Sequence, residues 1–378
     1  MAKKIDRKIL LNPGPATTTD SVKMSQVVSD ICPRENEFQK ILLSIRKDLL
    51  RIVNASQTDY TSVLFGGSGT SAMEAVISSV IPSDSRLLIL INGAYGKRME
   101  LIAKTYSIPY KTINLESGTS FDIKMIEKTL IEDSTIEYIS MVHHETTTGM
   151  LNPIEAIQEM SEQYSKTLIV DSISSFAGIP LDMRKNSIDY IMSTSNKCIQ
   201  GMAGISFIIC NKEKLEKLSS IPPRSFYLSL YDQYRYLEDH GQTRFTPPVQ
   251  TVYALRKAID EFFKEGYQNR YERYTENWRV LRTGMEKLGF KFLLDTKEES
   301  HILTTIIQPD NKEFDFMKVH DLMYDKGFTI YPGKISKKTF RLATMGEIFP
   351  SDIKRFLNAL SQVLTILGIK SVKYNEKN

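Results

Sequence analysis

The sequence predicts an α/β protein with a mainly parallel central sheet, followed by a smaller C-terminal α+β domain. Between residues 62 and 210, apolar runs of strand length alternate with segments of helix length, which is typical of a parallel sheet covered by helices on both faces. Beyond about residue 255, two long helical segments precede short strands and helices in mixed order. Polar residues that follow the apolar runs place the chemistry at the carboxyl edge of the sheet.

The expected elements follow from apolar periodicity in chain order. Two helices come first, at 21–29 and 37–53. The alternating region predicts strands at 62–65, 86–91, 110–114, 136–142, 168–171, 188–192 and 205–210. Between them we expect helices at 70–80, 97–105, 122–131 and 153–164. The last third predicts helices at 252–266, 269–288, 316–326 and from 352 onward, and strands at 290–294, 302–307, 329–331 and 339–343.

Composition and charge exclude several classes of protein. Of 378 residues, 41% are hydrophobic and 25% are charged, which is ordinary for a globular protein with a large core. The net charge of +4 is spread along the chain, and no basic run resembles a nucleic-acid-binding arm. The 3 cysteines lack metal-ligand spacing and favour a reducing compartment. No apolar run has the length of a signal-peptide core or a membrane span, so we expect a cytoplasmic protein. The spacing of the cysteines leads us to expect no metal site.

An aspartate and a lysine follow two of the predicted buried strands. Asp171 ends the apolar run 168–170, and Lys197 lies shortly after the run 188–192. Pyridoxal phosphate (PLP) needs this pair, because a lysine holds its aldehyde as a Schiff base and a carboxylate keeps its ring nitrogen protonated. Either residue alone is ordinary, since an aspartate after a strand is more often a turn former or a helix cap. The pair therefore indicates PLP only together with further stretches.

A glycine-rich turn joins a predicted strand to a predicted helix at residues 65–71. Ser68, Gly69 and Thr70 offer backbone N–H groups and hydroxyls at the start of a helix, which suits a phosphate. The turn is neither a P-loop nor the dinucleotide fingerprint, because the Gly-Lys-Ser/Thr ending and the GxGxxG spacing are missing. A tight turn with a simple cap is the alternative.

Three other positions offer groups that suit a flat, anionic ligand. Tyr95 follows the strand at 86–91 and could stack on a ring, although a core tyrosine is the ordinary interpretation. The hydroxyl run at 146–148 could contact a ring hydroxyl, and its alternative is a polar turn. The two histidines before it point to opposite faces of an extended chain, which makes a poor metal site. Arg341 could present its planar fork to a carboxylate or phosphonate, or could be a surface arginine.

Taken together, these stretches resemble the 2-aminoethylphosphonate–pyruvate aminotransferases, a family within the class V PLP-dependent enzymes. The resemblance covers essentially the whole chain in order. It departs from the family pattern at three places: after Cys32, where an aromatic residue and acids are usual; at His144, where cysteine is common; and at Pro247, where serine is usual. The matching motifs are LLNPGPATT (10–18), FGGSGTSAMEAVI (65–77), INGAYGKRM (91–99), HHETTTGMLNPIE (143–155), IVDSISSFAGIPLD (169–182), SNKCIQG (195–201), LYDQ (230–233), RFTPP (244–248), YPGK (331–334) and FRLATMGE (340–347).

The resemblance implies a fold-type I PLP-dependent transferase and a role for each matching position. Lys197 is expected to bind the cofactor covalently and to move the substrate proton, and Asp171 to pair with the ring nitrogen. Tyr95 is expected to stack on the ring. Thr147 is expected to contact the ring hydroxyl, and Gln200 the phosphate region.

Further residues are implied for the phosphate, the substrates and a partner subunit. Arg341 and Gly14 are expected to bind substrate, and Thr246 to reach the phosphate from the second subunit of a homodimer. The phosphate itself is expected to be held by Ser68, Gly69 and Thr70. The implied organisation is an N-terminal segment of residues 1–20 lining the active site, a large PLP-binding domain of residues 21–258 and a small domain of residues 259–378.

The implied reaction transfers the amine of 2-aminoethylphosphonate to pyruvate, giving phosphonoacetaldehyde and L-alanine. One alternative is a class V transaminase with another amino donor, such as alanine or serine, and glyoxylate or pyruvate as acceptor. A phosphate-binding protein that has lost catalysis is the alternative from another class, and the intact Lys197 and Asp171 argue against it. A cysteine desulfurase needs a mobile thiol in the small domain, and the absence of a cysteine beyond Cys210 argues against this activity.

Overall fold

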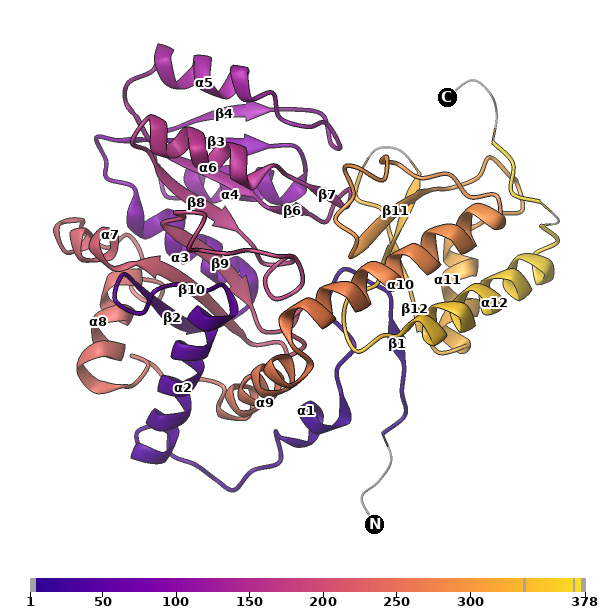
Figure 1. Cartoon of the computed structure of the whole chain (residues 1–378), viewed down its shortest axis with the longest axis horizontal. Helices are drawn as coiled ribbons and strands as arrows, with labels where there is room; N and C mark the ends of the chain where they lie inside the picture. Colours follow the sequence, from indigo (N-terminus) through magenta and orange to yellow (C-terminus); the bar gives the residue numbers. More distant parts are fainter. Residues whose placement is uncertain (1–4, 336–337, 370, 375–378) are drawn as a thin grey trace.

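The computed structural model describes residues 5–335, 338–369 and 371–374 (Figure 1). Its centre is a seven-stranded sheet with the order β2-β10-β9-β8-β5-β3-β4. Neighbouring strands are parallel except at β10, which runs antiparallel to both β2 and β9. The predicted α/β class with a mainly parallel sheet is therefore confirmed. The strands are β2 (Tyr60–Gly66), β3 (Arg86–Ile91), β4 (Tyr110–Asn114), β5 (Ile136–Val142), β8 (Thr167–Asp171), β9 (Tyr190–Thr194) and β10 (Ile205–Asn211).

Helices cover both faces of this sheet because its strands are apolar on both sides. Along β3, Leu88 and Leu90 pack into one core, whereas Leu87 and Ile89 pack into the other, as the two-residue period of a strand requires. The first core is covered by α2 (Asn36–Ile52), α5 (Ile123–Glu132), α6 (Ile154–Gln163) and α9 (Val249–Glu265). The second is covered by α3 (Gly69–Val80), α4 (Ala94–Thr105), α7 (Lys212–Glu216) and α8 (Leu230–His240).

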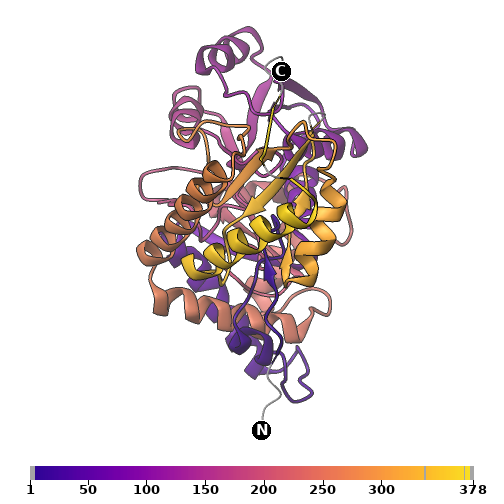
Figure 2. The same ribbon diagram turned by 90° about the vertical axis from the view of Figure 1, so that its right-hand side faces the viewer.

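The last third of the chain packs around its own apolar core beside the large sheet. A three-stranded antiparallel sheet has the order β11-β14-β13, and α10 and α12 lie side by side against it (Figure 2). These elements are α10 (Tyr267–Lys287), β11 (Leu303–Ile307), α11 (Phe316–Asp325), β12 (Phe328–Thr329), β13 (Tyr331–Pro332), β14 (Thr339–Ala343) and α12 (Pro350–Ile366). The strand expected at 290–294 is wrong, because this segment forms only an isolated bridge between Phe292 and Ile306.

The N-terminal segment joins the C-terminal part of the chain rather than the large sheet. Its strand β1 (Ile9–Leu10) pairs in parallel with β12, and Ile9 and Leu11 are buried in the smaller core. The segment then passes over the edge of the large sheet and ends in α1 (Asp20–Met24), which packs on α9. The expected boundary between 258 and 259 falls within α9, and the division into separate domains stays a prediction.

Candidate active site

The carboxyl ends of several strands bring the predicted residues to one cavity. Asp171 is the last residue of β8, and Lys197 lies in the turn after β9. Tyr95 lies in the first turn of α4, just after β3 ends. Since parallel strands end at the same edge, these residues meet although they are distant in the chain. The wall of the cavity is formed by Tyr95, His144, Thr146, Asp171, Ile173, Ser174 and Lys197.

The N-terminal segment covers Lys197. The Lys197 Nζ atom donates a hydrogen bond to the carbonyl oxygen of Pro13, and the backbone N–H of Ala16 donates to Asn196 O at 3.0 Å. Gly14 lies against the same side chain with φ +130°, and a Cβ at this position would lie 2.6 Å from Lys197 Cε. Only glycine fits this approach without displacing the lysine. Burial lowers the pKa of Lys197, which favours the neutral amine that acts as a nucleophile.

Asp171 is a buried carboxylate in an environment that disfavours its charge. It is only 3% exposed, and burial raises its pKa to about 7. The N–H of Ile173 donates to Asp171 Oδ1 at 2.8 Å, which opposes the shift. The negative charge of Glu145 raises the pKa, whereas Arg98 and Lys197 lower it. A carboxylate of this kind is stabilised by a cationic group placed in the cavity.

The start of α3 offers an anion site that includes an arginine not singled out from the sequence. Ser68 is the exposed N-cap residue, and its side chain makes no capping hydrogen bond. Arg98 donates from Nη1 to the hydroxyl of Thr70 at 3.1 Å, and its guanidinium lies 4.8 Å from the centre of the Tyr95 ring. The free N–H groups of the helix start and this cation together suit a phosphate. The sequence could have indicated Arg98, because it lies three residues after Tyr95 in a predicted helix and so on the same face.

The two threonines after Glu145 point in different directions. Thr146 lines the cavity, whereas the Thr147 hydroxyl accepts the N–H of Ala94 at 3.0 Å and so caps the start of α4. The Glu145 carboxylate is fully buried and accepts N–H groups from Tyr95 at 3.1 Å and Thr147 at 3.0 Å. The structure therefore places Thr146 on the cavity wall, and the expected contact of Thr147 with the ring hydroxyl stays a prediction.

Burial alone would raise the pKa of the Tyr95 phenol, yet its surroundings lower that pKa. A hydrogen bond with Thr146 has the largest lowering effect, followed by the positive charges of Lys197, Lys334 and Arg98. The Nζ atom of Lys334 lies 5.2 Å from the centre of the Tyr95 ring. Cationic side chains thus surround the Tyr95 ring in the wall of the cavity, and their positive charge favours an anionic ligand.

Arg341 in β14 reaches the wall of the cavity from the C-terminal part of the chain. It is 2% exposed and donates from Nη1 to Thr146 O at 3.0 Å and from Nε to Pro332 O at 3.1 Å. Burial lowers the pKa of its guanidinium. An arginine held in this way has a fixed fork for an acid group, and its role in substrate binding stays a prediction.

Two residues expected to bind the cofactor, Gln200 and Thr246, do not line the cavity of Lys197 and Asp171. The Gln200 side chain is buried, and its amide donates to the Tyr274 hydroxyl in α10 at 2.6 Å. Thr246 is exposed and lines a separate surface hollow with Phe65, Tyr227 and Phe245. A single chain leaves the expected contact from a second subunit untested, and both roles stay predictions.

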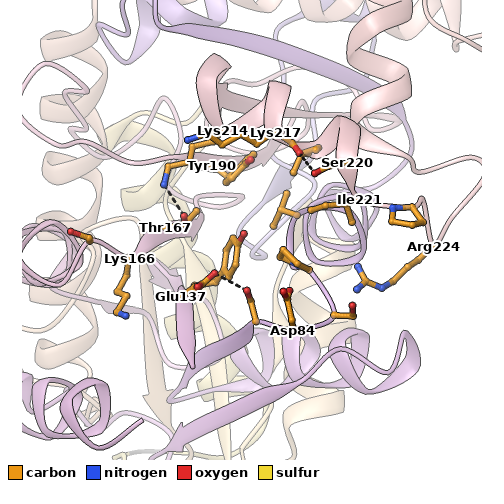
Figure 3. Close-up of a pocket in the computed structure, with 18 of the residues that line it drawn as sticks. Asp84, Glu137, Lys166, Thr167, Tyr190, Lys214, Lys217, Ser220, Ile221 and Arg224 are labelled. Carbon is orange, nitrogen blue, oxygen red and sulfur yellow. Dashed lines mark hydrogen bonds between the residues drawn. The ribbon is translucent and has the colours of Figure 1, made fainter. Parts of the chain in front are cut away.

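A much larger hollow of about 1050 Å³ lies at the opposite, amino edge of the sheet (Figure 3). Thr167 and Tyr190, the first residues of β8 and β9, line it. Several of its polar groups bind one another: Lys214 Nζ donates to Thr167 Oγ1 at 3.0 Å, and Ser85 donates to a Glu137 oxygen at 2.6 Å. The candidate active site is therefore the smaller cavity, where the acid and the amine converge.

The fold and this lysine–aspartate cavity are typical of the class-V aminotransferases, and the comparisons name the same family. The class-V aminotransferase family matches residues 20–334. The chain belongs to this family.

Relatives and solved structures agree with this assignment. A 2-aminoethylphosphonate–pyruvate transaminase from Phocaeicola vulgatus is 41% identical over 94% of this chain and 98% of the relative. A bifunctional phosphonoacetaldehyde hydrolase/aminoethylphosphonate transaminase from Clostridioides difficile is 40% identical over 94% of this chain, which spans 56% of that longer protein. The structure of an alanine–glyoxylate aminotransferase from Nostoc sp. matches with a TM-score of 0.88 and 25% identity, covering 96% of this chain and 97% of that one.

Two further findings concern the described residues alone. None of their helices combines the length and the apolar character needed to cross a membrane. Within the same ranges, histidines, cysteines and acidic side chains form no group of three or more that could hold a metal ion.

Proposed function

We propose that the chain is a PLP-dependent transaminase that transfers the amine of 2-aminoethylphosphonate to pyruvate, giving phosphonoacetaldehyde and L-alanine. The observation that carries the proposal is the shared cavity of Lys197 and Asp171 in a member of the class-V aminotransferase family. Relatives of about the same length that carry this activity in their names are 41% identical over 94% of the chain. They support the choice of substrates.

The residues present fit the cofactor. Asp171 offers a buried carboxylate for a protonated ring nitrogen, and Lys197 offers an amine with a lowered pKa. Tyr95 and Ile173 provide apolar surface in the wall of the cavity. The start of α3, with Arg98, would hold the phosphate. When bound, PLP supplies an aldehyde that carries the amino group and a ring that accepts electrons.

The protein's own groups then hold the substrates and move the proton. Lys197 Nζ would move the proton from the substrate carbon that bears the amine to the aldehyde carbon of the cofactor, and in the other half-reaction it would move a proton in the opposite direction. Arg341 holds the acid group of each substrate in turn, the phosphonate of the donor and the carboxylate of the acceptor. The N-terminal segment over Lys197 excludes water from the reacting atoms.

The partner and the compartment are part of the same proposal. We propose a cytoplasmic homodimer in which Thr246 of one subunit completes the phosphate site of the other. Its support is that Thr246 is exposed and lies beside the half-exposed Tyr227 and Phe245, which offer apolar surface to a second subunit.

A panel of amino donors tests the proposed substrates. The purified protein with PLP is mixed with 2-aminoethylphosphonate, alanine, serine and other amino acids in turn, and the visible absorbance of the cofactor is followed. We expect 2-aminoethylphosphonate and alanine to remove the band, with phosphonoacetaldehyde released from the first. Removal by other amino acids but not by 2-aminoethylphosphonate would identify a class-V transaminase of another donor. Failure to bind PLP would reject the enzyme altogether.

A further inference from the structure

The imidazole of His144 has one ring nitrogen without a partner at the wall of the active-site cavity. His144 lies in the short strand β6 (His144–Glu145), is 2% exposed, and lines the cavity together with Lys197 and Asp171. Its Nε2 atom is 2.8 Å from the Ser300 hydroxyl, whereas its Nδ1 atom is buried without a hydrogen-bond partner. A buried nitrogen without a partner is unfavourable, so this atom gains from a hydrogen-bonding group placed in the cavity.

The Ser300 hydroxyl can donate a hydrogen bond to the ring. The Ser300 oxygen accepts a long hydrogen bond from the N–H of Ile302 at 3.4 Å, so its own proton is free for His144 Nε2. The ring is neutral, because burial lowers the pKa of His144 to about 3, and the positive charges of His143 and Lys197 add to the effect. A neutral ring that accepts at Nε2 carries its proton on Nδ1. In this arrangement, with Ser300 as the donor to Nε2, the atom without a partner is a donor.

The orientation of the ring is fixed from the C-terminal part of the chain. The segment that carries Ser300 is bound to the hairpin of β6 and β7 (Met150–Leu151) by two backbone hydrogen bonds. Leu151 N donates to Glu298 O at 2.9 Å, and Ser300 N donates to Gly149 O at 3.0 Å. Because Ser300 cannot move away from the hairpin, the imidazole is held with Nδ1 in one position.

We infer that His144 is a ligand-binding residue of this transaminase, whose Nδ1–H donates a hydrogen bond to an anionic oxygen in the cavity. The inference rests on the proposed function. That oxygen belongs either to the ring of the cofactor or to the acid group of the bound amino substrate. Both are acceptors, and the cations around the cavity favour the anionic form of each.

Two substitutions separate the ring nitrogens. In His144→Asn the amide lies near the position of Nδ1 and does not reach Ser300, whereas in His144→Gln it reaches Ser300 and leaves the Nδ1 position empty. The dissociation constant of PLP and the KM for 2-aminoethylphosphonate and pyruvate are measured for both variants and for Ser300→Ala. We expect His144→Gln to weaken one of these constants about tenfold, as the loss of one hydrogen bond predicts, and His144→Asn to stay within about threefold of wild type.

The constant that changes identifies the source of the oxygen. A weaker affinity for PLP with unchanged KM values assigns it to the cofactor, and a raised KM with unchanged affinity for PLP assigns it to the substrate. Equal losses in His144→Asn, His144→Gln and Ser300→Ala would overturn the inference, because the link between the hairpin and the Ser300 segment would then be what matters. Wild-type values in His144→Gln would overturn it as well.

The wild-type protein provides a measurement that does not depend on the folding of a variant. In ¹⁵N-histidine NMR spectra we expect His144 as the neutral Nδ1–H tautomer, with an Nδ1 resonance that shifts when PLP or the amino substrate binds. A resonance that responds to neither ligand, in a protein that binds PLP, contradicts the role of His144 alone. A wild-type protein that binds no PLP contradicts the proposed function instead.

Discussion

The two edges of the same sheet differ in the state of their polar groups. At the amino edge, the polar groups that line the large hollow of Figure 3 are either exposed to solvent, as Asp84 is, or paired within the protein, as Lys214 is with Thr167 and Arg224 with the carbonyl of Ser78 at 3.0 Å. At the carboxyl edge, the cavity is much smaller, but Asp171 has a pKa raised to about 7 by burial and His144 Nδ1 has no partner.

This difference teaches that the volume of a cavity is a poor guide to chemistry in this fold. A hollow whose polar groups are solvated or paired has little to gain from a ligand, whereas a cavity with a buried acid and a buried ring nitrogen without a partner gains the interactions that they lack. The carboxyl edge also faces the starts of α3 and α4, which add positive dipole ends.

The largest effect on the rate is expected when the lysine at each edge of the sheet is substituted in turn. Lys197→Ala removes both the covalent attachment and the proton carrier, so the rate of transamination should fall at least about a thousandfold. Lys214→Ala, in the hollow at the amino edge, should leave the rate within about twofold, since it loses only a contact with Thr167. Initial rates, with mass spectrometry after borohydride reduction, check both. Equal effects of the two substitutions would break the comparison.

A smaller effect is expected from the buried acid, and its sign depends on pH. Burial raises the pKa of Asp171 from 3.8 to about 7, so the folded protein holds this proton more tightly than the unfolded chain. The stability that the group contributes is present below about pH 4 and is lost as the pH rises to about 7. Asp171→Asn should therefore stabilise the PLP-free protein at pH 8 by on the order of a few kcal/mol and change little at pH 4, while activity falls.

Urea unfolding between pH 4 and pH 8 measures this pH dependence. Asp84→Asn, which changes an exposed carboxylate of the amino-edge hollow, is the matched control and should shift the free energy of unfolding by less than about 0.5 kcal/mol. A stability difference between Asp171→Asn and wild type that is the same at all pH values would contradict the role assigned to burial.

The smallest effect is expected from adding one methyl group beside Lys197. Gly14→Ala places a Cβ 2.6 Å from Lys197 Cε and should lower kcat about tenfold, because the amine must move from its position. Gly327→Ala is the control: its φ is also positive, at +86°, but nothing lies within 4 Å of the new atom. Its kcat should stay near the wild-type value. Thermal unfolding of both variants separates strain from displacement of the lysine.

Much of the fold could be predicted because strands and helices leave local periodic patterns. The bounds expected for β3, β4, β5 and β14 agree with the structure residue by residue. The sequence analysis did not predict the helices α7 and α8, because their apolar periodicity is weak. It predicted a strand at 290–294, where the structure has only an isolated bridge.

By itself, the sequence determined the order of strands and helices and the positions of Asp171 and Lys197 after two buried strands. The side-chain pairings of the site were decided by the tertiary structure alone: Arg98 with Thr70, Thr146 on the cavity wall, and His144 with Ser300, 156 positions apart. The physical reason is that apolar periodicity records which face of an element is buried. It contains no information on which distant side chain a hydrogen bond will reach.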